Sequence, residues 1–294
     1  MRWAWPFNTR GRNGRNKEAN LSPSAAAPDF LCIGAHKAGT TWLYQQLDSH
    51  PDFWMPPVKE LHYFDQLSRV QRAARPRCRD DRDLRFLKQL ESLSVESDID
   101  LENYGRLFEA KASHLSGDIS PNYSTLSDDV IRQVVGYFPD LKVIFLARDP
   151  VERVWSHLSM EVHYRQIEPF DVSDIDEVDR NLFRRGMRLR SYPSAVVARW
   201  KRRVHPEQFR VYFFDDLQTD PAELRRSIVR FLGADPDKPG NRLPADYNSW
   251  TRMEKLPLPD NVRSHLAKVF KKELKTCATQ LGGPAKDWPT RYGF

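Results

Sequence analysis

The chain has 294 residues, of which 40% are hydrophobic, so it can bury a full apolar core in one large domain or two small ones; we expect one. The formal net charge is +6, but residues 1–20 hold five basic side chains against one acidic side chain and account for +4 of it. The remaining sequence is nearly balanced in charge, which argues against a nucleic-acid partner and makes any basic site a local one.

The cysteines and the apolar runs bear on the compartment. Cys32, Cys78 and Cys277 are odd in number and far apart, so the sequence predicts neither a disulfide framework nor a zinc site. No apolar run has the length of a transmembrane segment, and the N-terminus lacks the apolar core of a signal peptide. We therefore expect a cytoplasmic protein without a metal site.

The N-terminal stretch differs in composition from the rest. We expect a disordered basic tail over residues 1–28 and a folded domain over residues 29–294. Trp3, Trp5 and Phe7 stand among arginines in the tail, a pattern that can also lie on an anionic membrane surface. Weak contact with a membrane surface is therefore the alternative to a solvated tail.

Beyond the tail, short apolar segments alternate with segments of helical periodicity. This alternation predicts an α/β fold, with a P-loop-like parallel β-sheet flanked by helices on both faces in a single domain. Strands are expected at 30–33, 114–119, 143–147 and 210–214, and helices at 40–49, 128–138, 192–204, 222–232 and 259–283. Two highly charged interruptions, 66–94 and 164–190, are expected to form solvated helices or loops that shape an acceptor cleft.

The first motif is "FLCIGAHKAGTTWL", residues 30–43. It reads as a buried strand, a turn with two glycines and a helix that opens with Thr40 and Thr41. Such a turn brings backbone N–H groups and the positive end of a helix dipole to one point, which predicts a phosphate or sulfate site. A triphosphate loop of the form GxxxxGK(S/T) has its lysine after the second glycine, whereas here Lys37 lies inside the loop. That displacement argues against magnesium-dependent phosphoryl transfer.

The second motif, "VIFLARDP", ends an apolar strand with an arginine. Asp149 and Pro150 are typical of a helix N-cap and a first helical residue. Arg148, with Ser156 two helical turns further on, predicts a second anion clamp, although a salt bridge of Arg148 to a helix carboxylate is the alternative. Because ligands of α/β sheets bind at the carboxyl ends of the strands, both clamps suit one ligand with two separated phosphate groups.

These segments resemble a known family. "GAHKAGTTWL" and "VIFLARDPVERVWSHLSM" are similar to the 5′-phosphosulfate and 3′-phosphate segments of sulfotransferases that use 3′-phosphoadenosine 5′-phosphosulfate (PAPS). The resemblance continues through "PPVKELHYFD", "GDISPNY", "RSYPSAVVARW" and "FRVYFFDDLQTDPAELRRSIVRFLG", and is nearest to the carbohydrate or heparan-type and bacterial branch. It implies PAPS as cosubstrate, no metal, and contacts from Lys37, Ala38, Gly39, Thr40, Thr41, Trp42, Arg148, Ser156 and Tyr192.

The catalytic roles follow from the same resemblance. Lys37 suits the charge that builds on the bridging oxygen as the nucleotide leaves. The resemblance implies Glu60 as the general base that takes the proton of the acceptor. His62 lies on the same face of an extended segment and could orient Glu60 or replace it. The alternatives are an ion pair of Glu60 with Lys59, a merely packed His62, and a Tyr192 that packs on the sheet.

The acceptor side is less specified. We expect acceptor contacts from Lys59, His62, Ser120 and Tyr123, although Tyr123 fits the core equally well. Asp118 and Ile119 occupy the positions at which the resembled segment often carries Glu-Lys, so a lysine that helps to hold polyanionic sugars is missing.

The expected reaction is in-line transfer of a sulfuryl group to a hydroxyl, or alternatively an amine, of a carbohydrate, glycolipid or small molecule. A diverged Mg-ATP kinase and a non-catalytic nucleotide-binding protein are the other interpretations.

Overall fold

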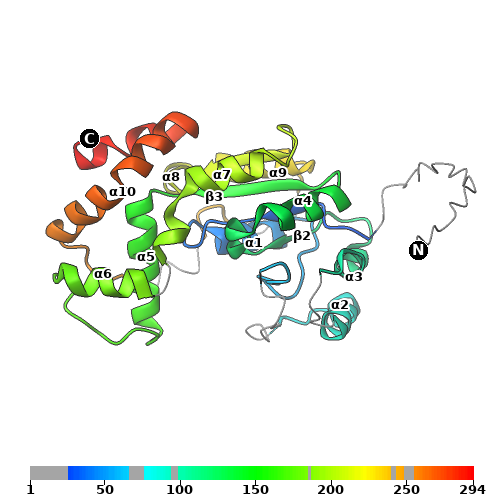
Figure 1. Ribbon diagram of the computed structural model, residues 1–294. Coiled ribbons are helices and arrows are strands. Elements are labelled where there is room, and N and C mark those ends of the chain that lie inside the picture. Colours follow the sequence, from blue (N-terminus) through cyan, green and yellow to red (C-terminus); the bar gives the residue numbers. More distant parts are fainter. Residues whose placement is uncertain (1–25, 66–75, 94–98, 185–186, 240–242, 248–254) are drawn as a thin grey trace, which may run out of the picture.

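The computed structural model describes residues 26–65, 76–93, 99–184, 187–239, 243–247 and 255–294. Its four strands form one parallel sheet in the order β2-β1-β3-β4 (Figure 1). This confirms the expected α/β class. The expected N-terminal tail lies outside the described residues except for 26–28. The strands are β1 (Phe30–Cys32), β2 (Gly117–Ile119), β3 (Lys142–Ala147) and β4 (Phe209–Phe213).

The strands form where the sequence is continuously apolar. In β3, every residue from Val143 to Ala147 is at most 1% exposed, as expected of a central strand that is covered on both faces. The second strand is shorter than the predicted 114–119. His114 donates its N–H to Lys111 in a turn, and Leu115 makes only an isolated bridge with Phe53, so the strand proper begins at Gly117.

The helices begin where the capping signals predict. Ser127 accepts a hydrogen bond from the N–H of Val130, and Asp149 accepts one from Val151, with Pro150 as the first helical residue. The helices are α1 (Thr40–Asp48), α2 (Asp81–Ser92), α3 (Leu101–Arg106), α4 (Asp128–Tyr137), α5 (Pro150–His163), α6 (Ile175–Arg184), α7 (Pro193–Lys201), α8 (Phe214–Thr219), α9 (Pro221–Leu232) and α10 (Asp260–Gln280). None in the described parts of the chain combines the length and apolar character of a membrane span.

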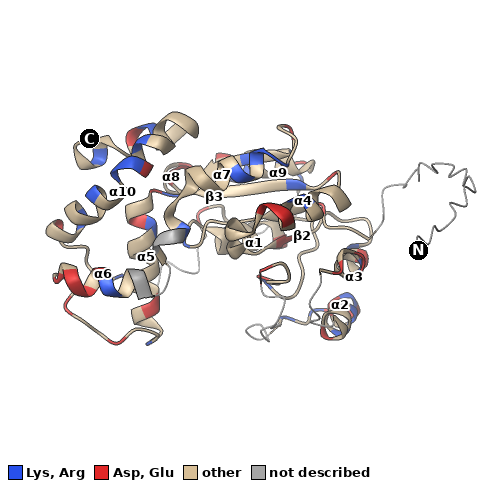
Figure 2. Cartoon of the chain, viewed as in Figure 1, with Lys and Arg blue, Asp and Glu red and all other residues tan. Residues whose placement is uncertain are grey.

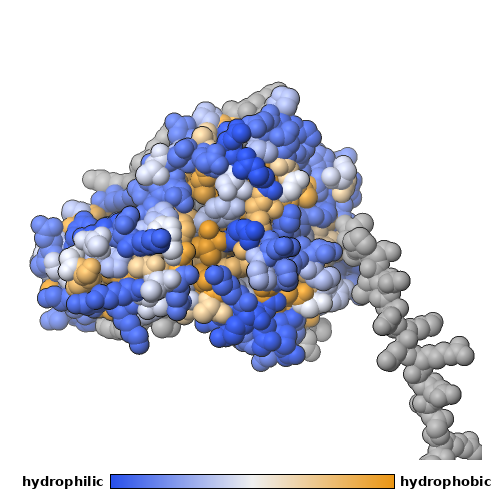
Figure 3. Space-filling model, turned by 90° about the horizontal axis from the view of Figure 1, so that it is seen from above, coloured by the Kyte–Doolittle hydropathy of each residue, from blue (hydrophilic) through white to orange (hydrophobic). Residues whose placement is uncertain are grey.

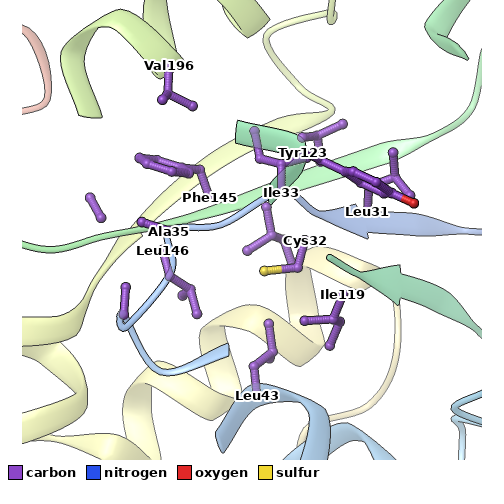
Figure 4. Close-up of a cluster of buried hydrophobic side chains, with 14 of the residues drawn as sticks. Leu31, Cys32, Ile33, Ala35, Leu43, Ile119, Tyr123, Phe145, Leu146 and Val196 are labelled. Atoms are coloured by element: carbon purple, nitrogen blue, oxygen red, sulfur yellow. The ribbon is translucent and has the colours of Figure 1, made fainter. Parts of the chain in front are cut away.

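Helices cover both faces of the sheet. Phe145 of β3 points toward Val196 of α7, whereas its neighbour Leu146 lies on the other face, the side on which Leu43 of α1 packs (Figure 4). Helix α4 packs beside α7, and α1 packs beside α9. Alternation of the buried side chains along β3 therefore supplies one apolar layer to each set of helices.

The two charged interruptions form helices in part, as expected (Figure 2). However, α2 packs against residues 107–111 and against the segment that follows α1. The indole of Trp54 donates to Asp83 at 3.2 Å and meets the ring of Phe86, which is completely buried. Helix α6 contacts α10, where His265 lies 3.0 Å from Asp179.

Candidate active site

A cavity of about 570 Å³ lies where the four strands end. Its wall includes Arg148 directly after β3, Phe214 directly after β4, Pro121 two residues after β2, and the loop that follows β1. On the face shown in Figure 3 the molecule is hollowed near its centre, and apolar residues gather there within a hydrophilic surround. The cavity brings together these residues expected from the sequence: Lys37, Gly39, Thr40, Thr41, Trp42, Glu60, Arg148 and Ser156.

The loop after β1 presents the start of α1 to this cavity. Gly39 has φ of +93°, and a Cβ atom there would lie 2.7 Å from Leu217 of α8, so the position requires glycine. The helix then begins at Thr40 without a capping side chain and without an acidic residue in its first turn. Helices α2, α4, α5 and α9, by contrast, each begin under an Asp or Ser cap. The positive end of α1 is thus left for an anionic ligand.

Lys37 contributes the charge of the loop. Burial, together with the nearby positive charges of Arg148 and Lys255, lowers the pKa of its ammonium group to about 8. A concentration of positive charge that weakens the proton affinity of a lysine is a site that gains from an anion.

Arg148 is 6% exposed and is held mostly by uncharged groups. Its Nη1 donates to the carbonyl oxygen of Lys37 at 2.6 Å, and its guanidinium lies 4.1 Å from the ring centre of Phe214. The alternative ion pair exists only as a 3.8 Å approach to Glu152, whose side chain is 38% exposed. Nε of Arg148 is buried without a hydrogen-bond partner among the described residues, and Ser156 lines the same cavity. A phosphate group fits this donor set.

Glu60 belongs to a row of charged groups. Its carboxylate pairs with Lys59 and lies 3.3 Å from Nε2 of His62, whose Nδ1 lies 2.9 Å from Asp65. Burial opposes ionisation of Glu60, but the hydrogen bond from His62 and the charge of Lys59 outweigh it and hold the pKa well below its usual range. The two carboxylates likewise outweigh the burial of His62 and raise its pKa to about 10. His62 is therefore an imidazolium at neutral pH, which suits orientation of Glu60 and not replacement of it.

Ser120 and Tyr123 do not line the cavity; both are fully buried around Asp118, contrary to the expected acceptor contacts. Ser120 donates to Asp118 at 2.6 Å, and Tyr123 donates to it at 2.7 Å. The same two hydroxyl oxygens accept the N–H groups of His62 and Tyr63, at 3.3 and 3.1 Å. They therefore hold the segment that carries Glu60.

Ala38, Lys59 and Tyr192 do not line the cavity. Ala38 is a buried residue of the loop itself, and Lys59 pairs with Glu60. Tyr192 precedes α7, and its ring packs edge-on against Phe270 of α10. Trp42 does reach the cavity, while its indole donates to the carbonyl of Ala245 at 2.7 Å.

Sequence reasoning missed several groups. Asp65 stands three residues after His62 in a quoted segment, so its spacing was a usable signal. His36 and Met160 line the cavity within the two anion-binding motifs, but nothing in their local sequence marks them. Lys255 also lines the cavity, and the sequence alone assigned it no role.

Comparison with known proteins decides the family. A profile described as the sulfotransferase family matches residues 28–238, which is more than half of the chain. The chain belongs to the sulfotransferase family. No curated protein sequence matches this sulfotransferase.

Solved structures agree in fold. A sulfotransferase from Alicyclobacillus acidocaldarius superposes with a TM-score of 0.64 at 24% identity, covering 90% of this chain and 99% of that one. The sulfotransferase domain from the curacin biosynthetic pathway gives 0.50 at 17% identity, with 83% and 98% covered. Mouse sulfotransferase SULT7A1, solved in complex with PAP, gives 0.50 at 12% identity, with 90% and 89% covered.

Proposed function

We propose that this sulfotransferase uses PAPS and transfers its sulfuryl group to an acceptor hydroxyl, with Glu60 as general base. The observation that carries the proposal is the single cavity that joins the uncapped start of α1, the Arg148–Ser156 pair and the Glu60 carboxylate. Support for the nucleotide also comes from the mouse sulfotransferase, whose structure contains PAP. When bound, PAPS would supply an activated sulfuryl group joined to the 5′-phosphate through a bridging oxygen.

The donor end would be held by two clamps. Lys37 and the first-turn N–H groups of α1 would receive the phosphosulfate, and Arg148 with Ser156 would receive the 3′-phosphate. The buried Nε of Arg148 gains the acceptor that it lacks in the described chain. These groups are fixed before the ligand arrives, so they stabilise developing charge without reorganising during the reaction.

The acceptor end depends on Glu60. The acceptor oxygen would bond to sulfur as the bond from sulfur to the bridging oxygen breaks; the acceptor proton passes to Glu60, and the electron pair stays on the bridging oxygen beside Lys37. Lys59 and His62 each hold one oxygen of the carboxylate, which leaves a lone pair on each for this proton. Positioning of both partners in one cavity is itself a large part of such catalysis.

The acceptor is proposed to be a hydroxyl compound of the carbohydrate, glycolipid or small-molecule classes, with an amine as the variant. Lys59 is engaged with Glu60, and the lysine of the resembled "GDISPNY" segment is replaced by the buried Ile119. These two facts give no support to a sulfated glycosaminoglycan at the reacting end.

A nucleotide titration tests the proposal. We expect 3′,5′-bisphosphoadenosine (PAP) to raise the thermal midpoint without magnesium. At a hundred times its Kd, PAP should add about 2.7 kcal/mol to the free energy of unfolding. Arg148→Ala should weaken the affinity for PAP roughly tenfold to a hundredfold, since hydrogen bonds to a charged group are lost. The affinity for AMP should stay unchanged because AMP has no 3′-phosphate. Arg132→Ala on α4 is the matched control; that side chain is 59% exposed and pairs with Asp129.

Three outcomes would count against the proposal. Stabilisation by magnesium-ATP alone would favour the diverged kinase. An equal loss of affinity for PAP and AMP in Arg148→Ala would show that Arg148 does not bind the 3′-phosphate. Tight PAP binding without turnover of PAPS on any hydroxyl or amine acceptor would favour the non-catalytic nucleotide-binding protein.

A further inference from the structure

His36 lies in the cavity wall but has no part in either anion clamp or in the row around Glu60. It stands immediately before Lys37 in the loop after β1 and lines the same cavity as Glu60. Its ring is stacked on that of His157 from α5, with centroids 5.0 Å apart and planes inclined by 25°. The stacking fixes the orientation of the ring in the cavity wall, so the positions of its two nitrogens are fixed as well.

The surroundings indicate which nitrogen carries the proton. Nδ1 of His36 is buried and has no hydrogen-bond partner in the described part of the chain. A neutral imidazole has one donor and one acceptor nitrogen, and buried N–H groups without a partner are rarer in proteins than unpaired acceptors. The proton therefore belongs on Nε2. Because Nδ1 is enclosed, the Nε2 edge is the one by which the ring reaches the cavity.

Burial, and with it the charge of a buried arginine, keeps the two histidines neutral. Arg153 donates to Ser191 and to the carbonyl of Met187, both at 2.6 Å, and its Nη1 lies 3.3 Å from Nδ1 of His157. These partners are uncharged, so the positive charge of the guanidinium persists beside the rings. Burial lowers the pKa of His36 to about 4; Glu60 opposes this shift and Arg153 adds to it.

We propose that Nε2–H of His36 donates a hydrogen bond to a non-bridging oxygen of the sulfuryl group during transfer. The inference rests on the proposed function. In the proposed reaction Lys37, the next residue, serves the bridging oxygen, and Glu60 takes the acceptor proton. Both line the same cavity as His36, so the group in transfer passes between two residues that share its cavity. A neutral donor stabilises charge on the sulfuryl oxygens without adding a cation that would repel Lys37 and Arg148.

The affinities for PAPS and PAP isolate this contact, because PAP lacks the sulfuryl group. Three variants are compared with the wild type: His36→Leu removes both nitrogens, His36→Gln places an amide N–H near Nε2, and His36→Asn places one near Nδ1. We expect His36→Leu and His36→Asn to weaken the affinity for PAPS about tenfold more than the affinity for PAP, which is the cost of one hydrogen bond to a charged group. His36→Gln should keep the ratio of the two affinities within about threefold of the wild type. Met160→Leu, another change in the wall, should leave the ratio unchanged.

The opposite results are equally clear. Equal losses of PAPS and PAP, an unchanged ratio in His36→Leu, or better retention by Asn than by Gln would overturn the role of His36. If the variants unfold, ¹⁵N NMR of the wild-type imidazoles decides: one Nε2–H resonance must shift with PAPS and not with PAP. A wild type that binds neither nucleotide would reject the proposed function itself, whereas PAP binding with an unchanged ratio rejects only this inference.

Discussion

The carboxylate of Glu60, the proposed general base, is held firmly in place by its charged neighbours. Each of its oxygens faces a cation, from Lys59 on one side and His62 on the other, and Asp65 fixes His62 in turn. A carboxylate with a low pKa is ionised throughout the neutral range, but it accepts a proton only late, once the new bond has made the acceptor hydroxyl acidic. The row of charged groups therefore keeps the proposed base ionised and oriented, at the cost of its proton affinity.

His62→Gln tests this arrangement. Loss of one cationic partner, with burial unchanged, should raise the pKa of Glu60 from below its usual range toward or above the ordinary value of 4.5. ¹³C NMR titration of the glutamate carboxyl carbons measures the pKa, with Glu60 assigned from Glu60→Gln. Since a base works in its deprotonated form, the acid limb of kcat/KM moves to higher pH in the variant. His114→Gln, which lies outside the site, should change neither the pKa of Glu60 nor the acid limb. An unchanged pKa of Glu60 in His62→Gln would show that His62 does not hold the carboxylate ionised.

Local patterns predicted the residues that a strand end or helix start carries. Arg148 follows β3 directly and Lys37 lies in the loop after β1, so their convergence needed only the rule that parallel strands end at one edge. Ser120 shows where such reasoning stops. Whether its hydroxyl meets the acceptor or an interior carboxylate depends on the burial of Asp118, which comes from packing between distant segments. Lys255 lines the cavity although it lies far along the chain from the two anion-binding motifs, and no sequence pattern marks it as part of the site.

At the scale of elements, the C-terminal end of the chain braces the start of α5. The hydroxyl of Tyr292 donates to Asp149 at 3.0 Å while Asp149 caps the helix through Val151. Burial raises the pKa of Asp149 to about 6, and the hydrogen bond from Tyr292 opposes that shift. A second cavity of about 350 Å³ lies here, with Arg148 in one wall and Tyr292 in another. The residues after α10 thus support the segment that carries the proposed 3′-phosphate clamp.

Tyr292→Phe measures this support. Removal of the hydroxyl leaves Asp149 buried with one donor fewer, so we expect the free energy of unfolding to fall by about 1.5–3 kcal/mol, the usual worth of a hydrogen bond to a charged group. PAP should bind several-fold more weakly, with AMP affected less, because Arg148 adjoins Asp149. Denaturant unfolding and nucleotide titration supply the two readings. Tyr137→Phe on α4, where the side chain is 49% exposed, is the control; equal effects in both variants would refute the brace.

At the scale of the whole molecule, the described body is secured just before β1. The carboxylate of Asp29 accepts the N–H of Ser116 at 2.7 Å and the ammonium of Lys111 at 2.8 Å, and the same ammonium donates to the carbonyl of Ala27. The family profile begins at residue 28, next to these contacts. The cavity wall draws only on residues from His36 onward among those described. The catalytic unit should therefore begin near Ala26, and the basic segment before it should serve another purpose.

Deletion of residues 1–25 tests this division. We expect the shortened protein to bind PAP within about twofold of the full chain and to melt within about 2 °C of it, because changes away from packed or paired groups rarely exceed about 0.5 kcal/mol. It should leave a cation exchanger earlier, since it loses +4 of the +6 net charge. Deletion of residues 1–29 is the contrasting variant, which removes the partner of Lys111 and Ser116 and should lower the melting temperature. A loss of PAP affinity after removal of residues 1–25 alone would place part of the basic segment at the nucleotide. Retained PAP affinity, together with lost sedimentation on anionic vesicles, would instead assign that segment to a membrane surface.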